Sequence, residues 1–336
     1  MHLQFFIYYS IASAGCKHIA LQIPGDYAIF ACGDVMNKKL TSSILLILAT
    51  IIWGSAFVSQ NIAMEHMGPF AFQAIRCFIA VFGMLPVIFI FDIISKDGSS
   101  FCKRWANRHL WRSGILCGIP LFLACNLQQV ALVDTDAGKA GFLTAMYIVF
   151  VPVFGLLRKQ KLGLNVPISV LIAAVGLYFL SCTEGLHIRL GDTLLLGCAV
   201  MFAVQITLVD KFAIGLDTLR LNAIQGLTCA ILSTVVMLIS EPLPRWNAIS
   251  NCTIPLLHVG FLSMGVAYAL QIVGQKNMEP AGASLIMSLE SVFAAIFGIL
   301  ILNEQMSQRE IIGCGLLFSA VILSQIPIKF KKKVHP

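Results

Sequence analysis

Glu290 is a carboxyl group in the middle of an apolar run of about 20 residues, the length that crosses a membrane. An ionised side chain at that depth costs about 2.5 to 3.5 kcal/mol, so such a group faces a protein interior or is protonated. Its chemistry allows two roles. It can bind a coupling proton or a substrate's ammonium group, or it can form a structural hydrogen bond to a neighbouring helix. The sequence leaves both roles open.

Uncharged polar side chains occur inside other apolar runs. Amides and hydroxyls in such surroundings need hydrogen-bond partners. A polar solute held in a cavity or the groups themselves can supply those partners, and the spacing does not decide between the two. We favour a solute or coupling cavity for the set as a whole. Its members are Tyr147, Asn126, Gln128, Tyr268 and Gln271.

Four further residues have a functional and a structural interpretation. Trp53 lies far from the membrane interface and is a candidate cavity wall, although close packing beside Gly54 explains it as well. Arg76 is a candidate anion site, but we expect it to extend to the interface or to pair with Glu65. Glu304 is a gating candidate or a solvated helix end, and Pro152 a candidate hinge.

The composition requires a membrane. Of the 336 residues, 58% are hydrophobic and 12% are charged, whereas a soluble domain is roughly a quarter charged. So few charged side chains cannot cover a soluble enzyme of this length. Apolar runs from end to end also exclude a disordered chain. Most of the eleven cysteines lie inside these runs without zinc-type spacing, so we expect neither a disulfide framework nor a metal site.

Ten runs are long enough for one membrane helix each, because backbone polar groups in lipid must be satisfied within the segment. The sequence therefore predicts an all-α polytopic membrane protein with ten transmembrane helices. The expected spans are Thr41 to Ala63, Pro69 to Phe91, Ser113 to Val133, Ala137 to Leu157, Val166 to Cys182, Thr193 to Leu208, Leu221 to Ser240, Ile254 to Gln275, Pro280 to Leu302 and Ile311 to Pro327.

Basic residues in the loops orient these spans, because cytoplasmic loops carry the excess of Lys and Arg. If the first span runs outward, seventeen basic residues lie in the cytoplasm, and only Lys139, Arg189, Arg245 and Arg309 lie outside. We therefore expect a multi-pass protein of the cell membrane, inner or plasma, with both termini cytoplasmic. Since the net charge of +7 comes from these loops, it indicates no nucleic-acid partner.

The two ends of the chain fall outside the ten spans. The apolar segment Leu3 to Ala14 is too short to cross a membrane, and no signal-peptide cleavage site follows it. The residues that begin at Met36 are typical of a cytoplasmic N-terminus before a first membrane helix. We therefore interpret residues 1–35 as an extension that is not native or as a short interfacial helix. Residues 329–336 are predicted to be a basic cytoplasmic tail that binds anionic headgroups.

The chain also repeats itself. A shift of 143 residues aligns Gln128 with Gln271 and pairs Tyr147 with Glu290. Because five helices separate the copies, an odd number, the second copy enters the membrane from the opposite side. Secondary transporters have this architecture, with the substrate site near the midplane. We predict two inverted five-helix repeats, over residues 36–183 and 184–328.

Four short motifs follow one another in a recognisable order and spacing. They are Trp53-Gly54-Ser55-Ala56-Phe57, Pro69 with Arg76 and Ala80, Leu289-Glu290-Ser291-Val292-Phe293, and Leu302-Asn303-Glu304 with Gly313. Together they resemble the EamA domains of the drug/metabolite transporter superfamily over nearly all of the chain after Met36. The resemblance implies a carrier that moves small metabolites, frequently outward, by alternating access. Two positions depart from the family's pattern, which often has Pro at Ser291 and a glutamate at Lys161.

We therefore expect a secondary active transporter that exports a small metabolite, an amino acid, a drug-like molecule or a similar solute. No phosphate-binding GxxxxGK[ST] loop occurs, so a gradient and not ATP is the expected energy source. A channel or a non-transporting receptor is the alternative. An enzyme is less favoured, because it would need paired titratable groups where only Glu290 is seen. The expected partners are the solute, the bilayer and protons. No cofactor is expected, and the oligomeric state stays open.

Overall fold

The structure is a computed structural model, and it describes residues 34–95, 101–135, 137–160, 163–181, 190–302 and 307–326. The chain divides between Thr41 and Ser42 into two units. Among the described residues, the first unit contributes only the beginning of one helix. All contacts and cavities below belong to the second unit. The predictions for Glu304, Lys161, most of the N-terminal extension and the basic tail fall outside the described residues.

Every regular element among the described residues is helical. The continuous helices are α2 (Asp34–Met64), α3 (Pro69–Ser95), α4 (Phe101–Trp105), α5 (Arg108–Ala131), α8 (Asn165–Ser181), α9 (Leu190–Phe212), α10 (Thr218–Ser240), α11 (Trp246–Asn251) and α16 (Gln308–Gln325). Three predicted spans are interrupted, and each consists of consecutive segments. These segments are α6 (Ala137–Ala145) with α7 (Tyr147–Leu157), α12 (Thr253–Leu257) with the π-helix η1 (His258–Ala267) and α13 (Tyr268–Gln275), and α14 (Pro280–Met287) with α15 (Glu290–Leu302).

Eight of the described helices or consecutive segments are long and apolar enough to cross a membrane, and α8 is a shorter apolar helix. Large apolar side chains such as Phe82, Leu171 and Ile239 are exposed on the outside of the bundle. A lipid-facing surface has this character. The prediction of an all-α polytopic membrane protein is therefore confirmed, whereas the count of ten spans stays a prediction.

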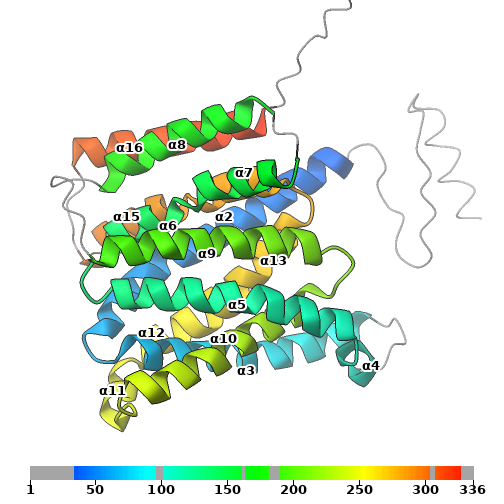
Figure 1. The fold of residues 1–336 in the computed structure, drawn as a ribbon, viewed down its shortest axis with the longest axis vertical. Coiled ribbons are helices and arrows are strands. Elements are labelled where there is room, and N and C mark those ends of the chain that lie inside the picture. Colours follow the sequence, from blue (N-terminus) through cyan, green and yellow to red (C-terminus); the bar gives the residue numbers. More distant parts are fainter. Residues whose placement is uncertain are drawn as a thin grey trace, which may run out of the picture. The chain divides into compact units, whose positions relative to one another are not determined.

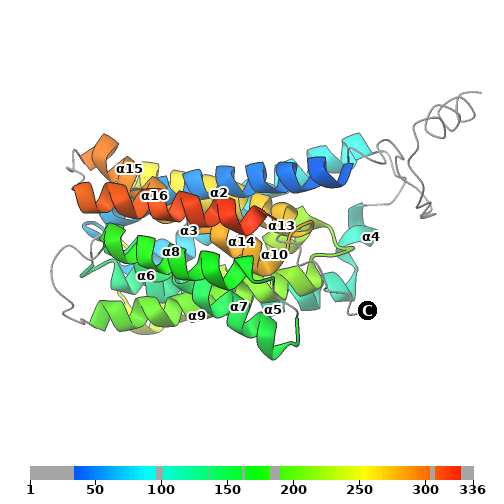
Figure 2. The ribbon, with the colours of Figure 1, turned by 90° about the horizontal axis from the view of Figure 1, so that it is seen from above.

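Small residues let the helices approach closely. α8 packs along α16, where a Cβ on Gly176 would lie 2.9 Å from the carbonyl oxygen of Gly313. α3 packs along α10 and η1, and α5 packs along α9 and α10. Figure 1 shows α8 and α16 on one side of the bundle and α3 with α10 on the other, and Figure 2 shows the helices from above. Because lipid is as apolar as these helices, the hydrophobic effect does not drive them together. Close packing of this kind stabilises their association instead.

α3 and α10 are connected at both ends. At one end, Arg220 at the beginning of α10 forms an ion pair with Asp92 near the end of α3, and the Arg220 side chain is only 1% exposed. At the other end, the carboxylate of Glu241 accepts hydrogen bonds from the backbone N–H groups of Phe70 (3.0 Å) and Ala71 (2.9 Å). Glu241 thereby caps the N-terminus of α3, where a negative charge is favourable.

The two broken helix pairs are interrupted at matching places. Met146 separates the end of α6 from the beginning of α7, and Ser288 and Leu289 separate α14 from α15. In both breaks the backbone changes to hydrogen bonds between residues three apart. The N–H of Met146 donates to the oxygen of Leu143 (3.3 Å), and the N–H of Leu289 donates to that of Ile286 (3.1 Å). Both breaks fall in the interior of the bundle, next to polar residues.

The third interruption is a π-helix of ten residues, η1. Its wide turns leave backbone carbonyls available to other groups. The amide of Asn222 on α10 donates to the oxygens of Met264 (3.3 Å) and Gly265 (2.8 Å). π-Helical segments are rare and occur frequently at functional sites.

Candidate functional site

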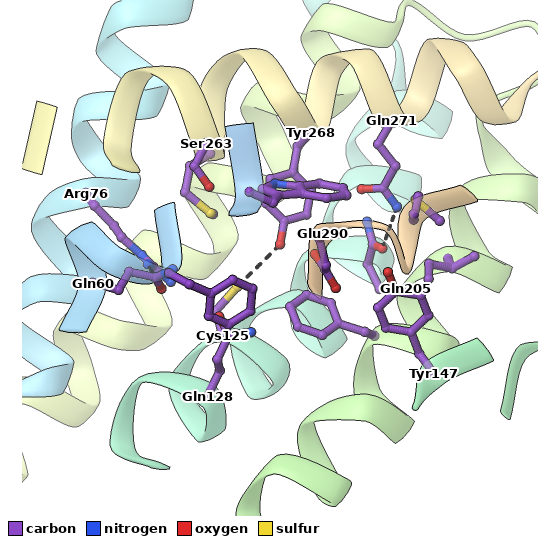
Figure 3. Close-up of a pocket in the computed structure, with 16 residues that line it drawn as sticks. Gln60, Arg76, Cys125, Gln128, Tyr147, Gln205, Ser263, Tyr268, Gln271 and Glu290 are labelled. Atoms are coloured by element: carbon purple, nitrogen blue, oxygen red, sulfur yellow. Dashed lines mark hydrogen bonds between the residues drawn. The ribbon is translucent and has the colours of Figure 1, made fainter. Parts of the chain in front are cut away.

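A cavity lies in the interior of the bundle, lined by α2, α3, α5, α7, α9, η1, α13, α14 and α15 (Figure 3). Its free space of about 40 Å³ holds a few water molecules. Six of the seven residues that the sequence nominated for solute or proton binding line it. They are Glu290, Tyr147, Trp53, Gln128, Tyr268 and Gln271.

Glu290 and Tyr147 lie together at the two helix breaks. Glu290 is the first residue of α15 and is 5% exposed, and Tyr147 is the first residue of α7 and is 3% exposed. Their side chains are close enough to act on each other electrostatically. Apart from this interaction with each other, neither Glu290 Oε1 nor the Tyr147 hydroxyl has a hydrogen-bond partner among the described residues. Buried polar atoms without partners are uncommon, and they mark places where water, a proton or a ligand is expected.

Ser291 fixes the beginning of α15 to the other broken helix. Its hydroxyl donates to the carbonyl oxygen of Gly141 on α6 (2.9 Å). This is the position where the family's pattern often has Pro, which could make no such bond. The departure therefore has a structural role, because it connects the two broken helices beside Glu290.

Arg76 does not extend to the membrane interface, contrary to the expectation from sequence. It is 2% exposed, it lines the cavity, and its Nη1 donates to Gln60 Oε1 on α2. Glu65, the expected partner, is exposed. The guanidinium also lies over the ring of Phe72, 5.5 Å from its centre, and Nε has no hydrogen-bond partner among the described residues. The amide of Gln60 and the ring of Phe72 thus replace the expected carboxylate.

A chain of amides borders the opposite side of the cavity. Gln205 on α9 accepts from Gln271 (3.1 Å) and donates to Gln225 (3.3 Å). Gln271 also donates to Gln275 (3.0 Å), and Gln225 donates to Asn222 (2.9 Å), which bonds to η1. Such a network fixes α9, α10 and α13 relative to one another, and it orients the amides that face the cavity.

Trp53 belongs to the cavity wall and to a tightly packed contact at once. Its ring meets that of Tyr268 edge to face, with centres 5.1 Å apart, and the Tyr268 hydroxyl lies 3.7 Å from Cys125 Sγ. The next residue, Gly54, faces α15, where an added Cβ would lie 2.4 Å from Cβ of Phe293. Both interpretations of the Trp53 segment from sequence therefore have a counterpart in the structure.

Two other predicted residues lie away from the cavity. Asn126 donates to Ser233 Oγ on α10 (2.8 Å), so its amide connects two helices and does not line the cavity. Pro152 lies inside α7, and the helix break occurs earlier, at Met146. The proline borders a separate cavity of about 260 Å³ together with Glu279.

His258, the first residue of η1, contacts two serines of α2. Its Nε2 lies 3.1 Å from Ser55 Oγ and its Nδ1 lies 2.9 Å from Ser59 Oγ, so it connects η1 to α2. The Ser55 hydroxyl donates to the carbonyl oxygen of Ile52 (2.8 Å). Nε2 must then carry the hydrogen that Ser55 accepts, and Nδ1 accepts from Ser59 when the ring is neutral.

Sequence reasoning missed several residues of the cavity wall, including Gln60, Phe57, Phe202 and Cys125. The sequence does contain a signal for them. Several residues of the cavity wall form pairs whose members are separated by the same number of positions along the chain. The shift of 143 residues that separates Cys125 from Tyr268 also separates Gln128 from Gln271 and Tyr147 from Glu290. One other shift pairs Phe57 with Phe202 and Gln60 with Gln205.

A bundle of membrane-spanning helices around a buried cavity with a cation, a carboxyl and several amides is an architecture of membrane transport proteins. The comparison with known families agrees. The model of the EamA-like transporter family matches residues 40–182 and 189–325, and the chain belongs to this family.

Relatives agree with this membership, and a solved structure has a similar fold. An uncharacterized transporter of Archaeoglobus fulgidus is 32% identical over 292 residues, 87% of this chain and 88% of the relative. The threonine/homoserine exporter RhtA of Escherichia coli K12 is 27% identical over 174 residues, 49% of this chain and 56% of that protein. A crystal structure with 17% identity covers 85% of this chain and 96% of its own, with a TM-score of 0.71, and it supports the fold.

Proposed function

We propose that the protein is a secondary active carrier that exports a small polar metabolite by alternating access and is driven by a proton gradient. The observation that carries the proposal is the buried Glu290, next to Tyr147 at the break of two helices, in a protein of a transporter family. Discontinuous helices around a midplane cavity are typical of secondary transporters. In this proposal Glu290 holds the coupling proton.

The proposed architecture is ten spans in two inverted repeats. The two stretches that match the family model, residues 40–182 and 189–325, support it, as do the two matching helix breaks. The packing supports it as well, because two sets of contacts have an equivalent in the other half. α3 packs on η1 as α10 packs on α5, and α6 with α7 packs on α8 as α14 packs on α16.

The size of the cavity supports alternating access. Free space of about 40 Å³ takes a few water molecules but not a metabolite, so the surrounding helices must move before a solute enters. In the proposed orientation both termini are cytoplasmic, as the basic loops indicate. Export is the direction that the name of RhtA gives for that relative.

Transport by purified protein in proteoliposomes under an imposed pH gradient tests this proposal. Labelled amino acids, sugars and lipophilic cations serve as probes, and wild type is compared with Glu290→Gln and with Glu65→Gln. Glu65 is exposed and provides a matched control. We expect one class of solute to accumulate with the gradient in wild type and Glu65→Gln, and the gradient response to disappear in Glu290→Gln. A Glu290→Gln protein that responds like wild type would assign the proton to another group. Movement without saturation or counterflow would indicate a channel.

A further inference from the structure

We propose that the solute is a zwitterion, whose carboxylate binds Arg76 and whose ammonium group binds Glu290. This inference rests on the proposed function and names its class of substrate. Arg76 and Glu290 are 2% and 5% exposed and line the same cavity. Among the described residues, neither has an oppositely charged side chain at ion-pair distance. Charged groups buried in a membrane protein are paired, and the partner absent here is one that a solute supplies.

The two groups occupy different parts of the cavity. Figure 3 shows Arg76 with Gln60 at one end, Gln205, Gln271 and Tyr147 toward the other, and Glu290 and Tyr268 between. A solute must therefore present its negative group at the Arg76 end and its positive group toward Glu290.

The two halves of the chain contribute similar residues to the cavity wall but differ in the charged groups they place there. Gln60 contacts Arg76 in one half of the chain, and Gln205 contacts Gln225 in the other. Likewise Tyr147 occupies in α7 the place that Glu290 occupies in α15. The wall is thus similar in the two halves but carries a cation in one and a carboxyl in the other, so a dipolar solute binds in one orientation.

Other classes of solute fit less well. A simple cation would leave Arg76 without an anion, and a simple anion would leave Glu290 without a cation. A sugar would pair neither group. The guanidinium offers a planar set of N–H donors that matches a carboxylate, and among these Nε is still unpartnered. A molecule with both charges pairs both groups at once when Glu290 is ionised.

Binding of such a solute also explains coupling. A protonated Glu290 carboxyl that receives an ammonium group loses its proton, so that –COOH and –NH₃⁺ become a –COO⁻···⁺H₃N– pair and one H⁺ is released. The carboxyl then holds either the proton or the solute, and exchange of one for the other through alternating access is antiport. No further co-reactant is needed.

Counterflow in proteoliposomes containing the full chain tests the inference. The labelled probes are glycine, threonine, leucine and phenylalanine, beside glucose, lactate and tetraphenylphosphonium. For each amino acid that moves, its methyl ester lacks the carboxylate, and its N-acetyl derivative lacks the ammonium group. We expect amino acids alone to exchange in wild type. Each blocked derivative should compete with the labelled amino acid at least about tenfold more weakly than the unlabelled amino acid does. A loss of this size is expected when one charged hydrogen bond is removed.

Variants separate the two subsites. Arg76→Gln should lose the discrimination against the ester and keep that against the N-acetyl form, and Glu290→Gln should do the reverse. A general folding defect would weaken all derivatives alike and cannot produce this crossed pattern. Arg76→Lys keeps a cation if Arg76→Gln does not fold, and it should retain part of the discrimination against the ester. Arg245→Gln and Glu65→Gln, both at exposed positions, are the matched controls.

The outcomes distinguish this inference from the proposed function. If glucose, lactate or tetraphenylphosphonium exchanges and amino acids do not, the carrier stands and the zwitterion is overturned. Equal competition by the blocked derivatives in wild type, or unchanged discrimination in both variants, also overturns it. If none of the probes moves, both proposals fail.

Discussion

Tyr147 and Glu290 lie 143 residues apart, and each is the first residue after the break of an interrupted helix, yet their side chains line one cavity. Cys125 and Tyr268 are separated by the same 143 residues and are in contact at 3.7 Å. Equivalent residues of two repeats meet only near an axis that relates the repeats. An axis that relates the two proposed repeats would therefore pass through the cavity, and a substitution at Tyr147 or Glu290 acts where the two repeats meet.

Tyr147→Phe should separate function from stability at this place. Apart from Glu290, the hydroxyl has no hydrogen-bond partner among the described residues, so its removal should change the free energy of unfolding by less than about 1 kcal/mol. It should nevertheless reduce gradient-driven transport, because Glu290 loses a polar neighbour beside the cavity. Thermal unfolding in detergent and transport in proteoliposomes measure the two effects. A large loss of stability with normal transport would make Tyr147 a structural residue.

Addition of a transported amino acid should release protons from the protein. The exchange of a proton for an ammonium group at Glu290 predicts up to one H⁺ per bound solute in weakly buffered detergent solution. A pH-indicator dye records the release, and the N-acetyl derivative serves as the control because it cannot replace the proton. Glu290→Gln should abolish the signal. Release of the same size from that variant would mean that another group carries the proton.

The helical fold and much of the cavity wall were predictable from local features. Apolar length predicted the spans, and isolated polar residues such as Glu290 and Gln271 indicated the cavity. The burial of Arg76 was not predictable, because its partner Gln60 lies on another helix, and only packing brings the amide to the guanidinium. The place of Asn126 outside the cavity wall was not predictable for the same reason, since the sequence cannot show that its amide donates to Ser233 on another helix.

The helix breaks also escaped prediction. Pro152 was the natural candidate for a hinge, because proline removes a backbone hydrogen bond. The break instead occurs at Met146, a residue with no helix-breaking character. The corresponding break at Ser288 and Leu289 also lacks Pro and Gly. Tertiary packing around the cavity decides these positions, and only the alignment of the two halves could have related them.

Gly54→Ala should destabilise the protein through the contact between α2 and α15. The added Cβ would lie 2.4 Å from Cβ of Phe293 and 2.8 Å from the backbone nitrogen of Ala294, so the helices must move apart. Overpacking of this kind costs about 1 to 3 kcal/mol. Gly315→Ala is the matched control, since its Cβ would meet no atom within 4 Å among those described. Equal stability of the two variants in thermal unfolding would contradict the close contact.

Asp92→Asn should weaken the connection between α3 and α10. The buried Arg220 bonds both Asp92 and Asp217, and its guanidinium also lies 5.3 Å from the ring centre of Trp105. Loss of one carboxylate leaves a buried cation with a single, more exposed anionic partner. Because hydrogen bonds to charged groups contribute about 1.5 to 3 kcal/mol, we expect a loss of that order in the free energy of unfolding.

A second Arg and Asp pair supplies the comparison for Asp92→Asn. Arg158 and Asp210 are 4.0 Å apart, and their side chains are 39% and 22% exposed, so Asp210→Asn should cost less than about 1 kcal/mol. A double-mutant cycle with Arg220→Gln isolates the interaction of Arg220 with Asp92. A coupling near zero would show that α3 and α10 are held by packing alone. A large coupling would show that the ion pair between Arg220 and Asp92 joins the two helices at this end.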